Sequence, residues 1–195
     1  MSSTSASALS SRLSSSWVGG ILLALIAWAG AATPAHAKVF AARLDAVAEA
    51  FGVGAEIESS TYVLTEEQVE RVEALAEERV EKRIVRVFTA RREGTLLGYA
   101  VVDLHMVRTL AEALLVVLSP EGTVRSVRVL AFHEPLDYLP IDRWYLQFDN
   151  STRSSVLRVG RDIHAVVGST LTTHATAGGV RRVLALYEVL IKDGD

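Results

Sequence analysis

The sequence predicts an α+β fold, in which helices pack on an antiparallel, partly curled sheet to form a two-layer single domain. Three observations lead to this prediction. The apolar spacing changes from three and four residues to two residues at Ile84. Turn pairs such as Glu93-Gly94 separate the alternating segments that follow. A final amphipathic segment, residues 172–191, supplies a helix that can cover the sheet.

The first 37 residues are predicted to be a secretory signal peptide. A Ser-rich start with Arg12 and no acidic residue leads into an apolar run, Trp17 to Ala32. The following Ala35-His36-Ala37 offers the small residues that signal peptidase requires, so we expect cleavage after Ala37. The apolar run is shorter than the roughly 20 residues of a membrane span, and an uncleaved membrane anchor is the alternative. Both interpretations predict a periplasmic or otherwise exported domain.

Composition limits the functions that the chain can have. Cleavage would leave 158 of the 195 residues, which suits one domain with a proper core. The formal charge of the whole chain is −3 and no basic block is present, so nucleic acid is not an expected partner. The absence of cysteine excludes disulfides, thiolate metal sites, iron–sulfur clusters and cysteine nucleophiles. Redox chemistry would therefore need a bound cofactor.

Residues 38–83 are expected to form an N-terminal helical region. A short helix at 43–51 should end at Gly52 and Gly54, and a hairpin-like connection should follow. The capping box Thr65-Glu66-Glu67-Gln68 predicts the start of a second helix that runs to about Arg83. The many Glu and Arg residues of that helix are interpreted as a solvated face rather than as a site.

Residues 84–195 are expected to form the main domain, which begins with a four-stranded meander. The predicted strands are 84–89, 96–102, 113–118 and 123–131. Residues 114–118 are all apolar, which predicts a central strand covered on both faces. A loop with a short helix follows, and we assign its Trp144, Tyr145 and Phe148 to the core rather than to a stacking surface for a ligand.

A last strand, Ile163–Val167, and a helix at 172–191 complete the prediction. The helix places its apolar residues on one side at three- and four-residue steps, with Arg181, Arg182, Glu188 and Lys192 opposite them. The pair Gly178-Gly179 falls inside this helix, so it is not interpreted as a nucleotide-binding loop.

The junction between this strand and this helix is the strongest candidate site. Free backbone amides and the positive end of the helix dipole attract anions at a helix N-terminus. Hydroxyls that add further donors come from Ser169, Thr170, Thr172 and Thr173. A phosphate group fits this chemistry. Spacing alone also allows a plain turn at Gly168 with Thr172 or Thr173 as the N-cap.

The junction sequence Val-Gly-Ser-Thr-Leu-Thr-Thr, residues 167–173, resembles the Ser/Thr-Gly-Ala-Thr-x-Thr-Ser signature of the FMN-binding domain family. Members include the flavin-carrying periplasmic subunits of Rnf and sodium-pumping NADH:quinone oxidoreductase complexes, and small exported FMN-binding proteins. Residues 127–136 resemble a second element of the family, which lies near the flavin. Residues 103–109 together with 138–144 resemble the small exported members. Val167 and Ser169 depart from the usual signature residues.

The resemblance implies that FMN is the cofactor and that a dedicated flavin transferase esterifies its phosphate to the hydroxyl of Thr170. The implied cofactor-binding residues are Gly168, Ser169, Thr170, Leu171, Thr172, Thr173, Glu134, His105 and Arg108. For Glu134 the alternatives are a contact with the flavin ring edge or the orientation of a loop on one side, and a strand-end acid that faces water on the other. His105 and Arg108 are suited to phosphate or to flavin carbonyls, because both carry charge-assisted donors.

The activity implied is electron transfer within a chain that includes a membrane redox complex, with no residue assigned a catalytic role. The alternatives are a flavin-dependent oxidoreductase with a diffusible substrate and an interaction module that has lost its flavin. His164 and His174 flank the junction, but their spacing is not that of metal ligands.

Overall fold

The computed structural model describes residues 35–194, and it defines side-chain surroundings from residue 42 onward. The predicted signal peptide lies outside the described residues, apart from its last three. The chain from Phe40 onward forms one compact unit. Within the described part of the chain, no helix is both long and apolar enough to cross a membrane.

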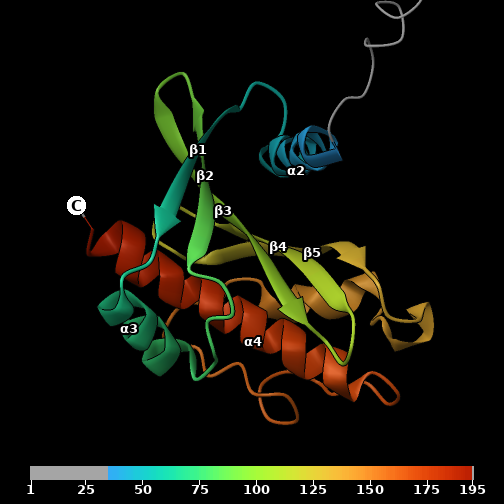
Figure 1. Cartoon of the computed structure of the whole chain (residues 1–195). Helices are drawn as coiled ribbons and strands as arrows, with labels where there is room; N and C mark the ends of the chain where they lie inside the picture. Colours follow the sequence, from blue (N-terminus) through green and yellow to red (C-terminus); the bar gives the residue numbers. More distant parts are fainter. Residues whose placement is uncertain (1–34, 195) are drawn as a thin grey trace, which may run out of the picture. The chain divides into compact units, whose positions relative to one another are not determined.

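A five-stranded antiparallel sheet forms the centre of this unit. Its strands are adjacent in sequence order, and they are β1 (Glu56–Val63), β2 (Ile84–Arg92), β3 (Thr95–Met106), β4 (Ala111–Leu118) and β5 (Val124–Phe132). The sheet is twisted and does not close into a barrel (Figure 1). The predicted α+β class, with helices packed on an antiparallel sheet in a single domain, is confirmed.

The first strand is an addition to the prediction. Instead of a hairpin-like connection, residues 56–63 form β1, which pairs with β2 along its whole length. Most of its side chains are exposed, and several are polar. An edge strand of this kind carries little of the alternating apolar pattern that identifies strands in a sequence.

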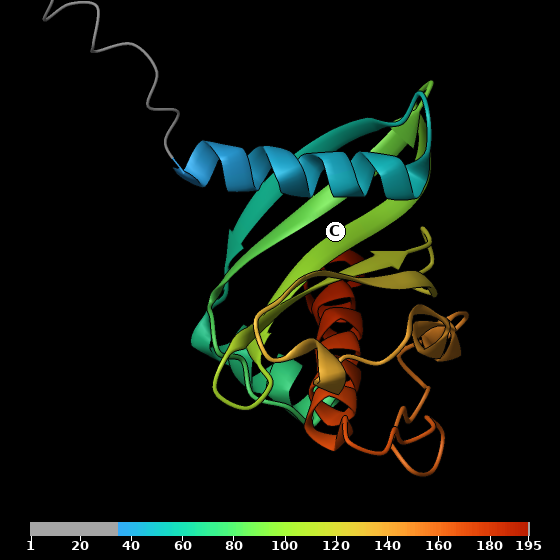
Figure 2. The same cartoon turned by 90° about the vertical axis from the view of Figure 1, so that its right-hand side faces the viewer.

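Helices cover the sheet on both faces. The helix α4 (Thr170–Tyr187), which continues as the π-helical turn η3 (Glu188–Lys192), packs on one face with α3 (Glu66–Ala76) beside it. The part of α2 (Ala35–Phe51) from residue 44 onward packs on the other face (Figure 2).

Strand β4 lies between these two hydrophobic layers. Leu114, Val116 and Leu118 pack in the core under α4, whereas Leu115 and Val117 pack in the core under α2. All five side chains are at most 2% exposed. The prediction of a central strand covered on both faces is therefore confirmed.

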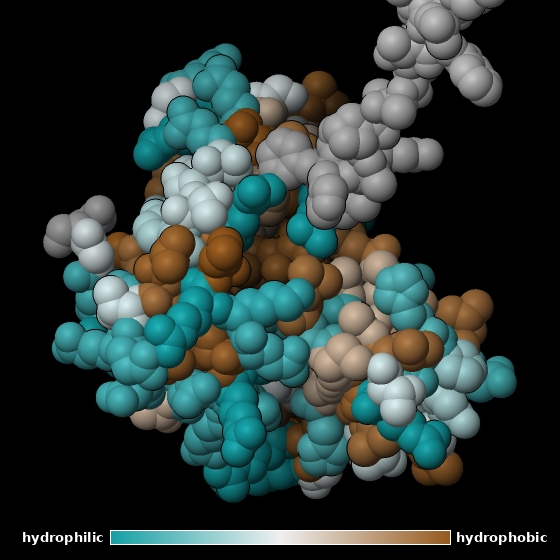
Figure 3. Space-filling view, viewed as in Figure 1, coloured by the Kyte–Doolittle hydropathy of each residue, from teal (hydrophilic) through white to brown (hydrophobic). Residues whose placement is uncertain are grey.

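Helix α3 begins as predicted and ends earlier. The hydroxyl of Thr65 accepts from the Gln68 amide, and the Gln68 side chain accepts from the Thr65 amide, which is the predicted capping box. The helix stops at Ala76 instead of Arg83, because Glu77 takes a left-handed conformation and the Ala76 carbonyl accepts from an arginine of α4. Hydrophilic side chains cover the outward side of this region (Figure 3).

Two short 3₁₀ helices follow β5, namely η1 (Leu136–Tyr138) and η2 (Asp142–Phe148). Trp144, Tyr145 and Phe148 are buried in the core, as predicted, and the Trp144 ring centroid lies 5.1 Å from that of Tyr145.

The predicted strand 163–167 is wrong. Ile163 makes only an isolated bridge with Val159, because the amides of residues 161–163 all donate to the Arg158 carbonyl in a tight turn. The side chain of Val167 is fully exposed rather than part of a strand.

Two glycines of the β2–β3 hairpin offer a matched test of packing. Gly98 has a φ of +145°, and a Cβ there would lie 2.1 Å from the Leu118 carbonyl oxygen of β4. Gly94, in the turn, has a φ of +77° but open space around its missing Cβ. We expect Gly98→Ala to lower the free energy of unfolding by about 2–3 kcal/mol, since β4 must shift, and Gly94→Ala by about 1 kcal/mol from backbone strain. Urea titrations of both variants measure this, and equal losses would contradict it.

Candidate functional site

A pocket of about 190 Å³ opens at the N-terminus of α4. It brings together most of the predicted cofactor-binding residues from three separate segments of the chain. The predicted residues that line it are Arg108, Glu134, Gly168, Ser169, Thr170, Leu171 and Thr172. Val107 and Tyr138 complete the wall. The predicted residues His105 and Thr173 do not line this pocket.

The N-terminus of α4 is uncapped, in contrast to that of α3. Ser169 occupies the N-cap position, yet its side chain makes no capping hydrogen bond. The first intrahelical bond is donated by the Thr173 amide to the Ser169 carbonyl. The amides of residues 170–172 therefore have no partner within the helix, and with the helix dipole they favour a negative charge.

The hydroxyl groups at this helix end have different surroundings. Thr173 is fully buried, and its hydroxyl donates to the Thr170 carbonyl at 2.9 Å. Thr172 is 1% exposed and lines the pocket, but its Oγ1 has no hydrogen-bond partner in the structure. Thr170 is exposed at the pocket wall. A buried hydroxyl without a partner is costly, so Thr172 marks a position where a polar ligand atom is favoured.

Glu134 fixes the loop that forms the opposite wall. Its Oε1 accepts from the amides of Thr109 and Leu110 at 2.8 and 2.9 Å and from the Thr109 hydroxyl at 3.2 Å. These hydrogen bonds, with a smaller effect of the Arg108 charge, lower the pKa of Glu134. Of the alternatives for Glu134, the observed contacts are those of loop orientation. The consequence is that an ionised carboxylate holds the loop that carries Arg108, through the amides of Thr109 and Leu110.

His105 lies in a buried chain of charged side chains instead of at the pocket. Its Nδ1 is 2.8 Å from Asp103 Oδ2, and its Nε2 is 2.9 Å from Glu112 Oε2. Asp103 in turn accepts two hydrogen bonds from Arg182, from Nε at 2.9 Å and from Nη2 at 2.7 Å. Thr176 donates to Glu112 at 3.4 Å. The five residues, from β3, β4 and α4, are at most 8% exposed.

The pKa shifts of His105 and Asp103 indicate that both side chains are ionised at neutral pH. Burial alone would lower the pKa of His105, but its hydrogen bonds to Asp103 and Glu112 outweigh burial and raise the pKa to about 9. Burial alone would raise the pKa of Asp103, but hydrogen bonds from His105 and Arg182 outweigh it and lower that pKa. His105 therefore carries both ring protons at neutral pH and donates to a carboxylate at each side.

The glycine pair of α4 allows this chain to form. A Cβ on Gly179 would lie 2.9 Å from Asp103 Oδ2 and 3.3 Å from the His105 ring, and a Cβ on Gly178 would lie 2.8 Å from Glu78. A larger residue at Gly179 would crowd Asp103 and His105 of β3, whereas one at Gly178 would displace the side chain of Glu78. The pair is thus a packing device, in line with its interpretation as something other than a nucleotide-binding loop.

The sequence pattern did not predict this buried group of hydrogen-bonded side chains. Arg182 was expected on the outward face of the last helix, but it is buried, because Asp103 provides a carboxylate across the interface. Two signals in the sequence were available. Glu112 is the one charged residue in the segment that forms β4, and Asp103 and His105 are two residues apart on the same face of β3.

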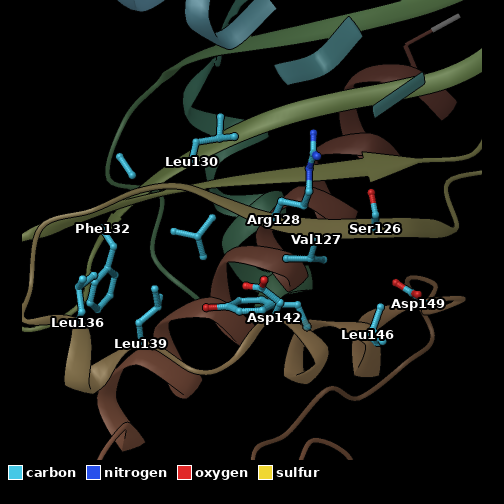
Figure 4. Close-up of a pocket in the computed structure, with 13 residues that line it drawn as sticks. Ser126, Val127, Arg128, Leu130, Phe132, Leu136, Leu139, Asp142, Leu146 and Asp149 are labelled. Carbon is cyan, nitrogen blue, oxygen red and sulfur yellow. The ribbon is translucent and has the colours of Figure 1, made fainter. Parts of the chain in front are cut away.

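A larger cavity, of about 670 Å³, lies along β5. Residues of β5 form one side of it, and residues of η1 and η2 form the other (Figure 4). Most of the segment that resembles the second element of the FMN-binding family is on its wall, from Val127 to Phe132 and at Leu136. η1 contributes Leu136 to this cavity and Tyr138 to the smaller pocket, so the two hollows are separated by one short turn.

Comparisons with known proteins found no match, either among protein-family models or among curated proteins. Within residues 35–194, no group of three or more His, Asp or Glu side chains is arranged to hold a metal ion.

The raised pKa of His105 predicts how stability depends on pH. Its contribution is fully present below about pH 6.5, the ordinary histidine pKa, and is lost as the pH rises through about 9. We expect the loss to reach about 3 kcal/mol. Urea midpoints measured between pH 6 and pH 10 test this, with His105→Gln as the control that should flatten the dependence. Equal slopes for both proteins would contradict the assignment.

Proposed function

We propose that the chain is an exported electron-transfer protein that binds FMN, with the flavin phosphate in the pocket at the α4 N-terminus and tethered to Thr170. One observation carries this proposal. The uncapped helix end, the unpartnered hydroxyl of Thr172, the Arg108 side chain and the exposed Thr170 all meet in one pocket. These are the features that bind and esterify a phosphate.

The residues present fit FMN in both chemistry and size. Three free amides, the Thr172 hydroxyl and the Arg108 guanidinium are donors for a phosphate. The pocket of about 190 Å³ suits a phosphate and the adjoining part of the ligand, but not a whole flavin. The cavity of about 670 Å³ across η1 has the size and the apolar character of sites that hold flat ring systems.

The residues of the site have separate roles. FMN, when bound, would supply the electron-carrying chemistry. Thr170 serves as the covalent anchor, because its hydroxyl is on the exposed side of the pocket. Thr172 and the free amides bind the phosphate, and Gly168, with a φ of +86°, turns the chain so that these amides face the pocket. Glu134 holds the loop that carries Arg108.

The arrangement favours an electron carrier over an enzyme that turns over a substrate. Among the residues lining the smaller pocket, Arg108 and Glu134 carry the charges, and Glu134 is occupied by three hydrogen bonds. His105, which the resemblance implied as a cofactor-binding residue, is enclosed with both ring nitrogens in use. Neither group is positioned to exchange protons with a substrate in the pocket.

The covalent tether is tested by producing the mature chain together with a flavin transferase. We expect a band that stays fluorescent in a denaturing gel and a mass gain of one FMN minus water. Thr170→Ala should abolish both, because it removes the oxygen that forms the bond to phosphorus. Thr170→Ser is the matched control and should load, since it keeps a hydroxyl at the same position. Fluorescence that survives Thr170→Ala would overturn the assignment.

The role of Glu134 is tested by two substitutions at the same position. Glu134→Gln keeps an oxygen acceptor for the amides of Thr109 and Leu110, so flavin loading should change little. Glu134→Ala removes that acceptor and frees the loop, and we expect the initial rate of loading to fall about tenfold. The rate is measured as the growth of protein-bound flavin fluorescence with time. Equal rates for the two variants would contradict a positioning role.

A further inference from the structure

Four buried polar atoms without partners lie in or near the walls of the candidate site. They are Thr172 Oγ1, Glu112 Oε1, the Tyr145 hydroxyl and Asp149 Oδ1. Thr172 lines the smaller pocket, and Tyr145 and Asp149 line the larger cavity. Glu112 connects Thr172 with Tyr145, because Thr176, one helical turn after Thr172, bonds to it, and because its charge helps burial to raise the pKa of Tyr145.

From Glu112, the buried row of hydrogen-bonded side chains continues to the opposite side of the α4–sheet interface. Along α4, Thr172, Thr176, Gly179 and Arg182 follow one another on the face that packs on β3 and β4. The hydrogen bonds run from Glu112 through His105 and Asp103 to Arg182. The outer end, with Asp103 and Arg182, reaches a shallow pocket of about 70 Å³ that is also lined by Glu81 and Lys82.

We propose that the proton carried by His105 between Glu112 and Asp103 compensates negative charge in the pocket, so that this proton and the bound flavin phosphate each favour the other. This inference rests on the proposed function. With the proton in place, the two carboxylates are balanced by His105 and Arg182. Without it, one uncompensated negative charge remains beneath the pocket. His105 is thus a positioning residue and makes no contact with the flavin.

The groups around His105 support its role as the titrating member. Asp103, from the same strand as His105, is held ionised by Arg182. Burial alone would lower the pKa of Arg182, but the hydrogen bonds that Arg182 donates to Asp103 raise it. Weaker effects on Arg182 come from Glu78 and Glu81. Tyr145, from η2, stays neutral, because burial, with Glu112 and Asp142, raises its pKa.

The expected coupling follows from distance. Six residue steps of helix lead from Thr170 to Thr176, a rise of about 9 Å, and His105 lies beyond Thr176 through the hydrogen bonds of Glu112. A unit negative charge at about 10 to 15 Å shifts a pKa by about one unit at an effective dielectric constant near 20. A phosphate at Thr170 should therefore raise the pKa of His105 by about one unit above its value of about 9 in the flavin-free chain. By reciprocity, loss of this proton should disfavour further negative charge on the flavin.

The test is a histidine titration by NMR of the mature chain, with and without loaded flavin, between pH 7 and pH 10.5. His105→Gln assigns the resonance by its loss. We expect the proton affinity of His105 to rise about tenfold on loading. Glu112→Gln keeps the hydrogen bond but removes the charge, so it should lower the pH midpoint of the His105 titration. In the loaded protein, a plot of the flavin reduction potential against pH should change slope near the pH midpoint of the His105 titration. His105→Gln should remove this change of slope. Circular dichroism confirms that both variants fold.

The outcomes separate this inference from the proposed function. Two outcomes overturn the inference and leave the flavin assignment standing. One is loading at Thr170 with an unchanged pH midpoint for His105, and the other is a change of slope that survives His105→Gln. Failure to load overturns the proposed function and the coupling with it. If His105 titrates near pH 6.5 in the flavin-free protein, the buried row of charged side chains is itself overturned. A purely structural role for His105 would change stability without moving the potential.

Discussion

The contact between α4 and strands β3 and β4, made through buried charges, is the constraint on which the rest of the structure depends. Arg182, Asp103, His105 and Glu112 form a continuous row across this interface. Removing one member would leave an unpaired buried charge, which costs several kcal/mol. The row therefore fixes how far α4 lies along the sheet and which of its faces points inward. Gly179 is required because the row occupies the space of a side chain.

This fixed placement of α4 determines the geometry of the pocket. The same strands that supply Asp103, His105 and Glu112 are joined by the loop that carries Arg108, and Glu134 ties that loop down. The same buried row of charged side chains thus holds both walls of the pocket in place, and neither wall depends on a flexible segment. The helix end can remain uncapped because its position is maintained from within the protein, and this leaves its amides available to a ligand.

Local patterns in the sequence account for what could be predicted, and long-range contacts account for what could not. Strands β2 to β5 and the capping box at Thr65 are encoded by spacing within a few residues. By contrast, the end of α3 depends on Arg181, which bonds to the Ala76 carbonyl over 105 positions. The burial of Arg182 depends on Asp103, 79 positions away. The residues at 168–172 were predictable because they are contiguous, whereas the buried row beneath them is assembled by the fold.

The tethered flavin that we propose would place two opposing demands on the α4 N-terminus, and the burial pattern of this helix turn suits both. The anchor must be rigid enough to fix the group, and the group must remain open to partners. Thr172 and Thr173 face inward and are buried, while Thr170 and Leu171, in the same helical turn, are exposed. Because a helix turns by about 100° per residue, neighbouring positions can belong to the rigid interior and to the surface. The alternation of buried and exposed residues in the first turn of α4 would therefore allow the buried row of charged side chains to act on a group that faces outward.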